Sequence, residues 1–206
     1  GQTQLFKISS LNSLSILIKM GIALITSKMI AVFVGPGGMA YIGNFRNFIT
    51  SLEGISTLAF SSGVVKYVGE NEDKEKELTK IITTVLVTFL VFSTVLGFLI
   101  FVFSDFLCAK FFGNNLQYEI VFKVVAIVLP FSVVSVLFVS IINGLGSYSK
   151  LIYATIISNI VALVLTVLLI YEFKLVGALL SIALNPTILF TINFFYVPKE
   201  LQLLSR

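Results

Sequence analysis

Long apolar runs dominate the chain, and turn-like or charged segments separate them. A membrane-spanning helix needs about 20 mostly apolar residues. Four runs are close to that length without a charged residue, and two earlier runs exceed it with charges inside them. The runs are continuous rather than alternating, which favours helices over the strands of a membrane barrel. We therefore predict an all-α membrane protein whose residues 1–206 form a single lobe of six transmembrane helices: 8–34, 39–65, 81–103, 124–142, 151–171 and 175–197.

The composition agrees with a membrane location. Of the 206 residues, 57% are hydrophobic and 12% are charged, with a mean hydropathy of +1.05. Soluble domains carry about 45–50% apolar and about 25% charged residues, which excludes an ordinary cytosolic enzyme, a disordered chain and a nucleic-acid-binding module. The sequence has no histidine and one cysteine, Cys108. Ser-His-Asp and Cys-His catalysis are therefore excluded, and no catalytic residue, metal or cofactor is expected.

Basic residues are distributed unevenly between the two sides of the predicted bundle. Six spans place both termini on the same side, and eight cations fall on that side against three on the other. Because basic residues favour the cytoplasmic side, both termini are predicted to be cytoplasmic. The eight are Lys7, Lys66, Lys74, Lys76, Lys80, Lys150, Lys199 and Arg206, and the three are Lys110, Lys123 and Lys174.

The first two predicted spans carry charges deep in the membrane. A charged side chain at the bilayer centre costs about 2.5–3.5 kcal/mol on insertion scales, so these charges must be paired or must face water. Lys28 lies near the outer end of its span and is expected to snorkel to the headgroups. Polar residues recur at helical spacing around the other charges, and two such stripes on adjacent helices predict a water-accessible wall. The stripes comprise Asn12, Ser15, Lys19 and Thr26 in the first span and Gly43, Arg46, Asn47, Thr50, Glu53, Gly54, Thr57 and Ser61 in the second.

Arg46 is the strongest candidate for binding an anionic substrate. Its guanidinium presents a rigid fork of donors that suits phosphate oxygens, and Lys19, Asn47 and Thr50 complete the candidate substrate-binding group. Glu53 is the one carboxylate deep in a predicted span, which makes it a candidate for coupling to H⁺ or Na⁺. At a rise of about 1.5 Å per residue, Lys19 and Glu53 lie at similar depths. The alternative is therefore an ion pair between them that fixes helix packing.

The other four spans hold polar residues without charge. Asn185-Pro186 is expected to break the last span near mid-membrane, since proline removes a helical hydrogen bond. Ser158 and Asn159 are interpreted chiefly as contacts between helices, with a ligand role as the alternative.

A short block resembles the first loop and second helix of bacterial Wzx-type flippases for lipid-linked oligosaccharides, a family that includes O-antigen translocases and lipid III flippases. The block reads VGPGGMAYIGNFRN at 34–47. Similar short strings follow at 63–68, 111–114 and 142–144, so the resemblance extends over nearly the whole chain. This family belongs to the multidrug/oligosaccharidyl-lipid/polysaccharide exporter superfamily of MATE-like transporters.

The resemblance implies both a fold and a function. Members of the family have two six-helix lobes, and they flip undecaprenyl-diphosphate-linked oligosaccharides across the bacterial inner membrane by alternating access, for O-antigen or enterobacterial common antigen synthesis. This chain would match the N-terminal lobe, with Arg46 lining a cationic cavity and Lys19 beside it. Expected partners are the lipid-linked substrate, membrane lipids, glycan polymerase machinery, and a second six-helix lobe or a homodimer partner, but no nucleic acid.

The main alternative is an ion-coupled multidrug or cation antiporter of the same superfamily. Such a site should be dominated by deep carboxylates, whereas cations outnumber carboxylates three to one in the predicted spans. A membrane enzyme is disfavoured by the short outer loops and the lack of histidine. Because six spans are half of the family's number, the chain is interpreted as a fragment, a half-sized protein acting as a dimer, or a remnant.

Overall fold

The computed structural model describes residues 1–57, 61–71, 73–113, 115–144 and 148–204. The elements are α1 (Gln2–Phe33), α2 (Pro36–Thr57), α3 (Ser61–Glu70), α4 (Glu75–Val102), α5 (Ser104–Phe112), the 3-10 helix η1 (Leu116–Tyr118), α6 (Glu119–Gly144), α7 (Tyr148–Phe173) and α8 (Leu175–Leu204). Five helical segments of the described chain are long and apolar enough to cross a membrane, in α1, α4, α6, α7 and α8. The predicted all-α membrane fold is confirmed.

The structure divides the second predicted span, 39–65, between α2 and α3, and residues 58–60 lie outside the described chain. With 22 residues, α2 is long enough to span about 33 Å at a rise of about 1.5 Å per residue. Its glycines, asparagines and charged residues make it more polar than the five apolar helices. Five of the six predicted spans thus meet the criteria of both length and hydropathy. Helix α2 is long enough but more polar.

The predicted break at Asn185-Pro186 is wrong, because α8 runs without interruption from Leu175 to Leu204. Pro186 has no N–H to donate to the carbonyl of Ile182, but neighbouring helices in a membrane can satisfy backbone groups near a proline. The Oγ of Ser135 in α6 donates a hydrogen bond of 3.2 Å to the carbonyl oxygen of Pro186. This bond joins α6 to α8 at the proline.

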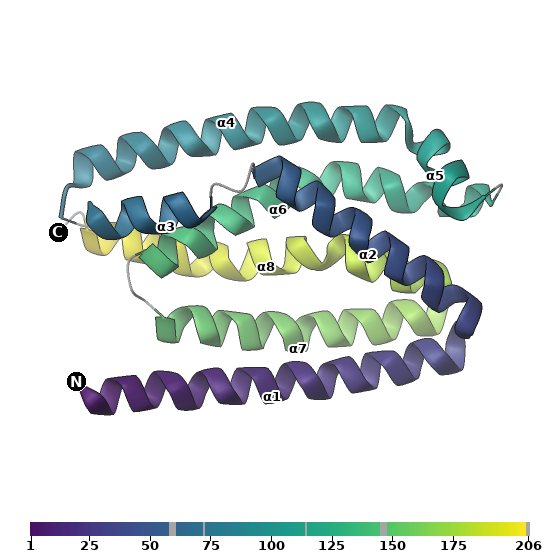
Figure 1. Cartoon of the computed structure of the whole chain (residues 1–206), viewed down its shortest axis with the longest axis horizontal. Coiled ribbons are helices and arrows are strands. Elements are labelled where there is room, and N and C mark those ends of the chain that lie inside the picture. Colours follow the sequence, from purple (N-terminus) through teal and green to yellow (C-terminus); the bar gives the residue numbers. More distant parts are fainter. Residues whose placement is uncertain (58–60, 72, 114, 145–147, 205–206) are drawn as a thin grey trace.

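Helix α6 forms the centre of the bundle, and α3, α4 and α8 pack against it (Figure 1). Its most apolar window is 67% buried, as expected of a helix that is hydrophobic on every face. Near its start, Phe122 is fully buried, with ring centroids 5.7–5.9 Å from those of Phe45, Phe48 and Phe112. Burial of a large apolar side chain contributes about 1.5–3 kcal/mol, so this aromatic cluster holds α2 against α6.

Helix α1 is the outermost helix on the side of the bundle opposite α4, and it packs mainly against α7 (Figure 1). Only 6% of its most apolar window is buried, and large side chains such as Leu17 and Leu24 are exposed. Apolar surface left in water costs about 25 cal/mol per Å². The sides of α1 that face away from α7 therefore require lipid or protein around them.

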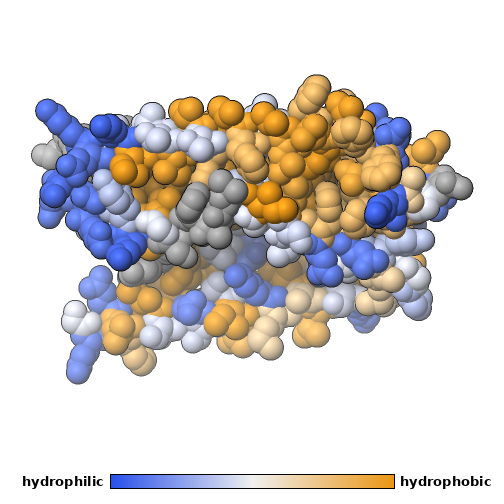
Figure 2. All heavy atoms as spheres, turned by 45° about the horizontal axis from the view of Figure 1, so that its top comes forward, coloured by the Kyte–Doolittle hydropathy of each residue, from blue (hydrophilic) through white to orange (hydrophobic). Residues whose placement is uncertain are grey.

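Hydrophilic residues gather at one end of the molecule, and apolar residues cover much of the face beyond it (Figure 2). That end holds the N-terminus, the end of α8, α3, and the starts of α4 and α7, whereas α5 and the α1–α2 turn lie at the opposite end (Figure 1). Both ends of the described chain therefore lie at the same end of the bundle, which agrees with an even number of crossings. The cytoplasmic location of this end stays a prediction.

A tight turn joins α1 to α2. Gly35 has a φ of +83°, a conformation that glycine adopts without steric cost. The N–H groups of Val34 and Gly35 both donate to the carbonyl of Ile30, at 2.8 and 3.0 Å, and so satisfy the end of α1. Pro36 then begins α2, where its fixed φ suits the first helical position. The turn brings the polar residues of α2 next to α1.

Helices α4 and α6 cross closely at Gly97, where a Cβ would lie 2.6 Å from the carbonyl oxygen of Ala126. We expect Gly97→Val to lower the free energy of unfolding by about 1–3 kcal/mol, because the added atoms force the two helices apart. Gly21→Val in α1 is the matched control, since a Cβ there meets nothing within 4 Å. Thermal unfolding in detergent measures both variants, and equal melting temperatures would contradict this close crossing.

Cys108 in α5 is fully buried, and its Sγ donates to the carbonyl oxygen of Asn115 at 3.2 Å. Burial raises the pKa of the thiol above its ordinary value, and the thiolate is the reactive form. We expect N-ethylmaleimide to label the native protein slowly, faster at alkaline pH, and rapidly after denaturation in SDS, as followed by mass spectrometry. The control is Asp105→Cys in a Cys108→Ser background, because Asp105 is exposed on the same helix. Equal native labelling rates would show that Cys108 is accessible.

Candidate functional site

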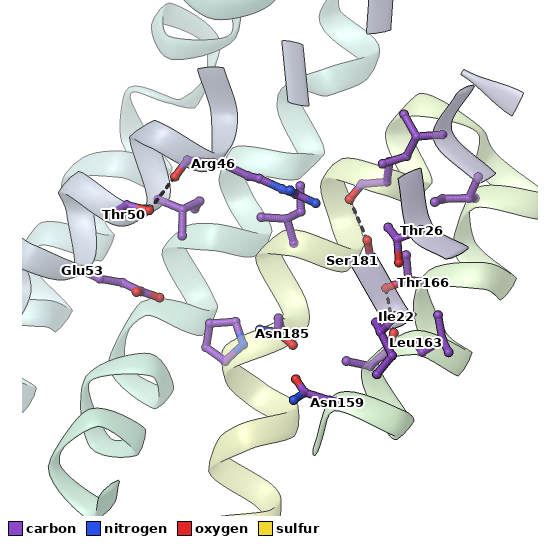
Figure 3. A pocket seen from close by; sticks show the side chains of 17 residues that line it. Ile22, Thr26, Arg46, Thr50, Glu53, Asn159, Leu163, Thr166, Ser181 and Asn185 are labelled. Carbon is purple, nitrogen blue, oxygen red and sulfur yellow. Dashed lines mark hydrogen bonds between the residues drawn. The ribbon is translucent and has the colours of Figure 1, made fainter. Parts of the chain in front are cut away.

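A cavity of about 400 Å³ lies between α1, α2, α7 and α8. Its wall combines charged, amide and hydroxyl groups with branched apolar side chains, the mixture found in small-molecule sites. Figure 3 shows polar side chains from all four helices around this space. The polar lining residues are Thr26, Arg46, Thr50, Glu53, Asn159, Thr166, Ser181 and Asn185.

Arg46 reaches the cavity because of its position on α2. Phe45, one residue earlier, is fully buried in the aromatic cluster, and successive helical residues point about 100° apart. Arg46 therefore points away from that core and into the cavity (Figure 3). Thr50 lines the same wall one turn later, and its Oγ1 donates a hydrogen bond of 2.9 Å to the carbonyl oxygen of Arg46. The structure thus brings these two predicted residues together.

Glu53 lies two turns after Arg46 on the same face of α2 and is half-buried at the cavity wall. Its Oε1 accepts a hydrogen bond of 3.1 Å from the Oγ of Ser132 in α6, and Ser132 is only 4% exposed. A carboxylate held by a buried donor beside a polar cavity can exchange protons or cations with it. The position of Glu53 therefore fits the predicted water-accessible wall.

A second cavity of about 210 Å³ adjoins the first and shares Thr26, Arg46 and Asn159 with it. Lys19 of α1 lines this smaller cavity, whereas Glu53 lines the larger one. The structure thus places Lys19 with Arg46 rather than with Glu53. Two cations at one small cavity repel each other and favour an anion between them.

The structure does not bring Asn47 to either of these cavities. Asn47 lies on the neighbouring face of α2, at an open hollow of about 540 Å³ that it shares with Asn44, Ser51 and Lys110. Adjacent residues of a helix do not share a face, which is why Asn47 parts from Arg46. The side chains of Thr57 and Ser61 lie outside the described part of the chain.

Four polar residues of α7 and α8 line the larger cavity although the sequence pattern did not assign them to it: Asn159, Thr166, Ser181 and Asn185. Thr166 and Ser181 donate their hydroxyls to backbone carbonyls of their own helices, both at 2.7 Å. An asparagine in an apolar span costs free energy unless its amide group is hydrogen-bonded. The presence of Asn159 and Asn185 in apolar spans was therefore the sequence signal that could have identified them. Whether a neighbouring helix or a cavity satisfies the amide depends on packing, which the sequence does not display.

The two cavities suit binding by charge and hydrogen bonding. They present two cations, one carboxylate, amides and hydroxyls, and such groups recognise anions, cations and hydroxyl-bearing molecules. Among the described residues, no group of three or more His, Cys, Asp or Glu side chains is placed to hold a metal ion.

The chain is similar to known proteins along nearly its whole length. Residues 5–200 match the family model described as "Polysaccharide biosynthesis protein". Curated relatives include the lipid III flippases of Escherichia coli (strain K12) and Shigella flexneri, each 29% identical over 98% of this chain and 47% of the relative's length. The chain therefore spans about half the length of these relatives. No solved structure gives a significant match.

These relatives confirm the resemblance seen at residues 34–47 to lipid-linked oligosaccharide flippases. The relatives align with almost all of this chain but with only half of their own length, which agrees with one lobe of a two-lobed protein. Because the family model covers nearly the whole chain, this protein belongs to the polysaccharide biosynthesis protein family.

Proposed function

We propose that the protein to which this lobe belongs flips a polyprenyl-diphosphate-linked oligosaccharide across the bacterial inner membrane, for O-antigen or enterobacterial common antigen synthesis. The observation that carries the proposal is the exposed guanidinium of Arg46 in a cavity between four helices. A guanidinium binds phosphate oxygens through paired, charge-assisted hydrogen bonds. The relatives named lipid III flippases support the same class of activity.

Diphosphate binding gives a purpose to the two cations of the smaller cavity. Lys19 and Arg46 line this cavity together, and a bound diphosphate replaces their mutual repulsion with attraction. Opposite charges 4 Å apart gain about 4 kcal/mol at an effective dielectric constant of about 20. The two cations therefore hold the diphosphate headgroup inside the lobe. For the headgroup to leave on the opposite side of the membrane, the cavity must close to one side and open to the other.

Alternating access, in which the cavity opens first to one side of the membrane and then to the other, requires a second unit that faces this lobe. The matched relatives are about twice the length of this chain, and the outer surface of α1 requires a cover of lipid or protein. We therefore place a second six-helix lobe in the same polypeptide, with a homodimer partner as the alternative. The lipid-linked substrate, membrane lipids and glycan polymerase machinery are the other proposed partners, and both termini are proposed to be cytoplasmic.

The position of Glu53 supports the coupling of transport to an ion gradient. Ion coupling is also expected of the alternative function, a multidrug or cation antiporter. The carboxylate lines the cavity that Arg46 also lines. Binding of H⁺ or Na⁺ at Glu53 makes the local charge more positive and strengthens the attraction for a diphosphate. Release of the ion weakens that attraction, so an ion gradient can give flipping a direction.

We expect Arg46→Gln to slow the transfer of labelled lipid-linked oligosaccharide between leaflets by roughly 10- to 100-fold, because hydrogen bonds to charged groups contribute about 1.5–3 kcal/mol. Arg46→Lys keeps the charge but loses the fork, so an intermediate rate is expected. The measurement uses vesicles that contain the protein in its full natural length.

Lys28→Gln is the matched control for Arg46→Gln. Lys28 is an exposed cation of α1 that lines neither of the two cavities of the described chain, so its transfer rate should match wild type. A wild-type rate for folded Arg46→Gln protein would remove Arg46 from substrate binding. Equal losses in the two variants would instead indicate a general effect of charge.

We expect Glu53→Gln to abolish the response of transfer to an imposed pH or sodium gradient, because an amide neither titrates nor holds a cation by charge. Transfer of the lipid-linked oligosaccharide between leaflets in the absence of a pH or sodium gradient should persist. Glu77→Gln at the exposed start of α4 is the control and should respond like wild type. Transfer that still follows the gradient in Glu53→Gln vesicles would rule out coupling through this carboxylate.

A further inference from the structure

The two adjoining cavities differ in the hydrogen-bonding groups that they present. The polar side chains that line the smaller one can all donate: the ammonium of Lys19, the guanidinium of Arg46, the hydroxyls of Thr26 and Ser27, and the amide of Asn159. The two cationic groups have no acceptor at all. Because ionised phosphate oxygens only accept hydrogen bonds, this set fits a phosphate.

The larger cavity adds acceptors on the α2 and α8 sides. Glu53 contributes a carboxylate, and Asn185 contributes an amide that both donates and accepts. A carboxylate repels phosphate but accepts hydrogen bonds from hydroxyls. The larger cavity is therefore better suited to a saccharide, whose hydroxyls donate and accept.

Asn159 lies where the two cavities meet, since it lines both. Its Nδ2 is buried, and no group in the described part of the chain accepts a hydrogen bond from it. An unsatisfied buried donor costs about 1–3 kcal/mol. Rotation of the Asn159 amide toward a ligand in the cavity would give the Nδ2 an acceptor and recover that cost. Figure 3 shows Asn159 of α7 and Asn185 of α8 pointing into the same space. This geometry favours a ligand role for Asn159 over the helix contact expected from sequence.

We propose that Asn159 and Asn185 form a saccharide-recognition subsite beside the phosphate subsite of Lys19 and Arg46. The inference rests on the proposed function and names the part of the substrate that each cavity holds. The diphosphate occupies the smaller cavity, and the first sugar occupies the larger one, whose volume of about 400 Å³ lies within the range of about 300–1,000 Å³ for small-molecule sites. The remaining sugars extend beyond it.

This arrangement separates affinity from specificity. The cations attract any polyprenyl diphosphate, because they recognise only charge and phosphate geometry. The amides distinguish between sugars, since a site built to hydrogen-bond a hydroxyl is left with unpaired groups when that hydroxyl is missing. The sugar next to the diphosphate therefore determines which lipid-linked substrate is bound.

The test compares two probes on the protein in its full natural length, in lipid nanodiscs. One probe is undecaprenyl diphosphate, and the other is a panel of undecaprenyl-diphosphate-linked hexoses and N-acetylhexosamines. The measured quantity is the Kd of the bare lipid divided by that of the best glycolipid. We expect Asn159→Leu and Asn185→Leu each to lower this ratio about three- to tenfold, since each removes hydrogen bonds to the sugar. Arg46→Gln should weaken both probes and leave the ratio unchanged.

Ser158→Ala is the matched control for Asn159→Leu. Ser158 is the preceding residue and lines neither cavity, and its Oγ is also buried without a hydrogen-bond partner in the described part of the chain. Ser158→Ala therefore removes such a group away from the cavities and should leave the ratio at the wild-type value. Melting temperatures report whether each variant folds, and Asn185→Leu decides the question if Asn159→Leu does not fold.

Several outcomes would overturn the subsite while leaving the flippase proposal intact. They are an unchanged ratio in both folded asparagine variants, equal weakening of both probes, or a panel in which no sugar improves on the bare lipid. If neither probe binds the wild-type protein, the proposed function itself fails. The two failures are therefore distinguishable in one set of measurements.

Discussion

The energetic cost of placing charged and polar groups in hydrocarbon governs the arrangement of this lobe. Exposed leucine, valine and phenylalanine side chains cover the outer helices α1 and α4, where lipid is an acceptable neighbour. The polar helix α2 instead turns one face to the aromatic cluster and another to the cavity. Lys19, Arg46 and Glu53 line spaces that water or a charged ligand can fill.

Helix α6 determines the shape of that space although it does not line the larger cavity. Its Phe122 holds α2 by contact with Phe45, and its Ser132 and Ser135 bind Glu53 and the carbonyl of Pro186, respectively. One buried helix therefore contacts two walls of the cavity, one on α2 and one on α8. A buried centre of this kind holds the cavity side chains in place from behind.

The sequence was sufficient for the fold class and for the residues of α2 that face the cavity. Apolar runs of membrane length predict helices directly, and the spacing of Arg46, Thr50 and Glu53 places them on one face of any helix. Asn47 belongs to the same stripe of three- and four-residue steps, but such a stripe is wide, and adjacent members such as Arg46 and Asn47 point about 100° apart; Asn47 therefore lies at a separate hollow. The break expected at Asn185-Pro186 and the packing role of Asn159 both depended on what lies beside α7 and α8, and only the assembled bundle contains that information.

The position of the two chain ends has a consequence for how larger proteins of this kind can be built. Since the start of α1 and the end of α8 lie at the same pole of the bundle, two units of this fold joined in tandem through a short linker insert with the same orientation. The two units would then be related by a rotation about the membrane normal rather than by an inversion. Under that rotation, the two units present equivalent surfaces to each other.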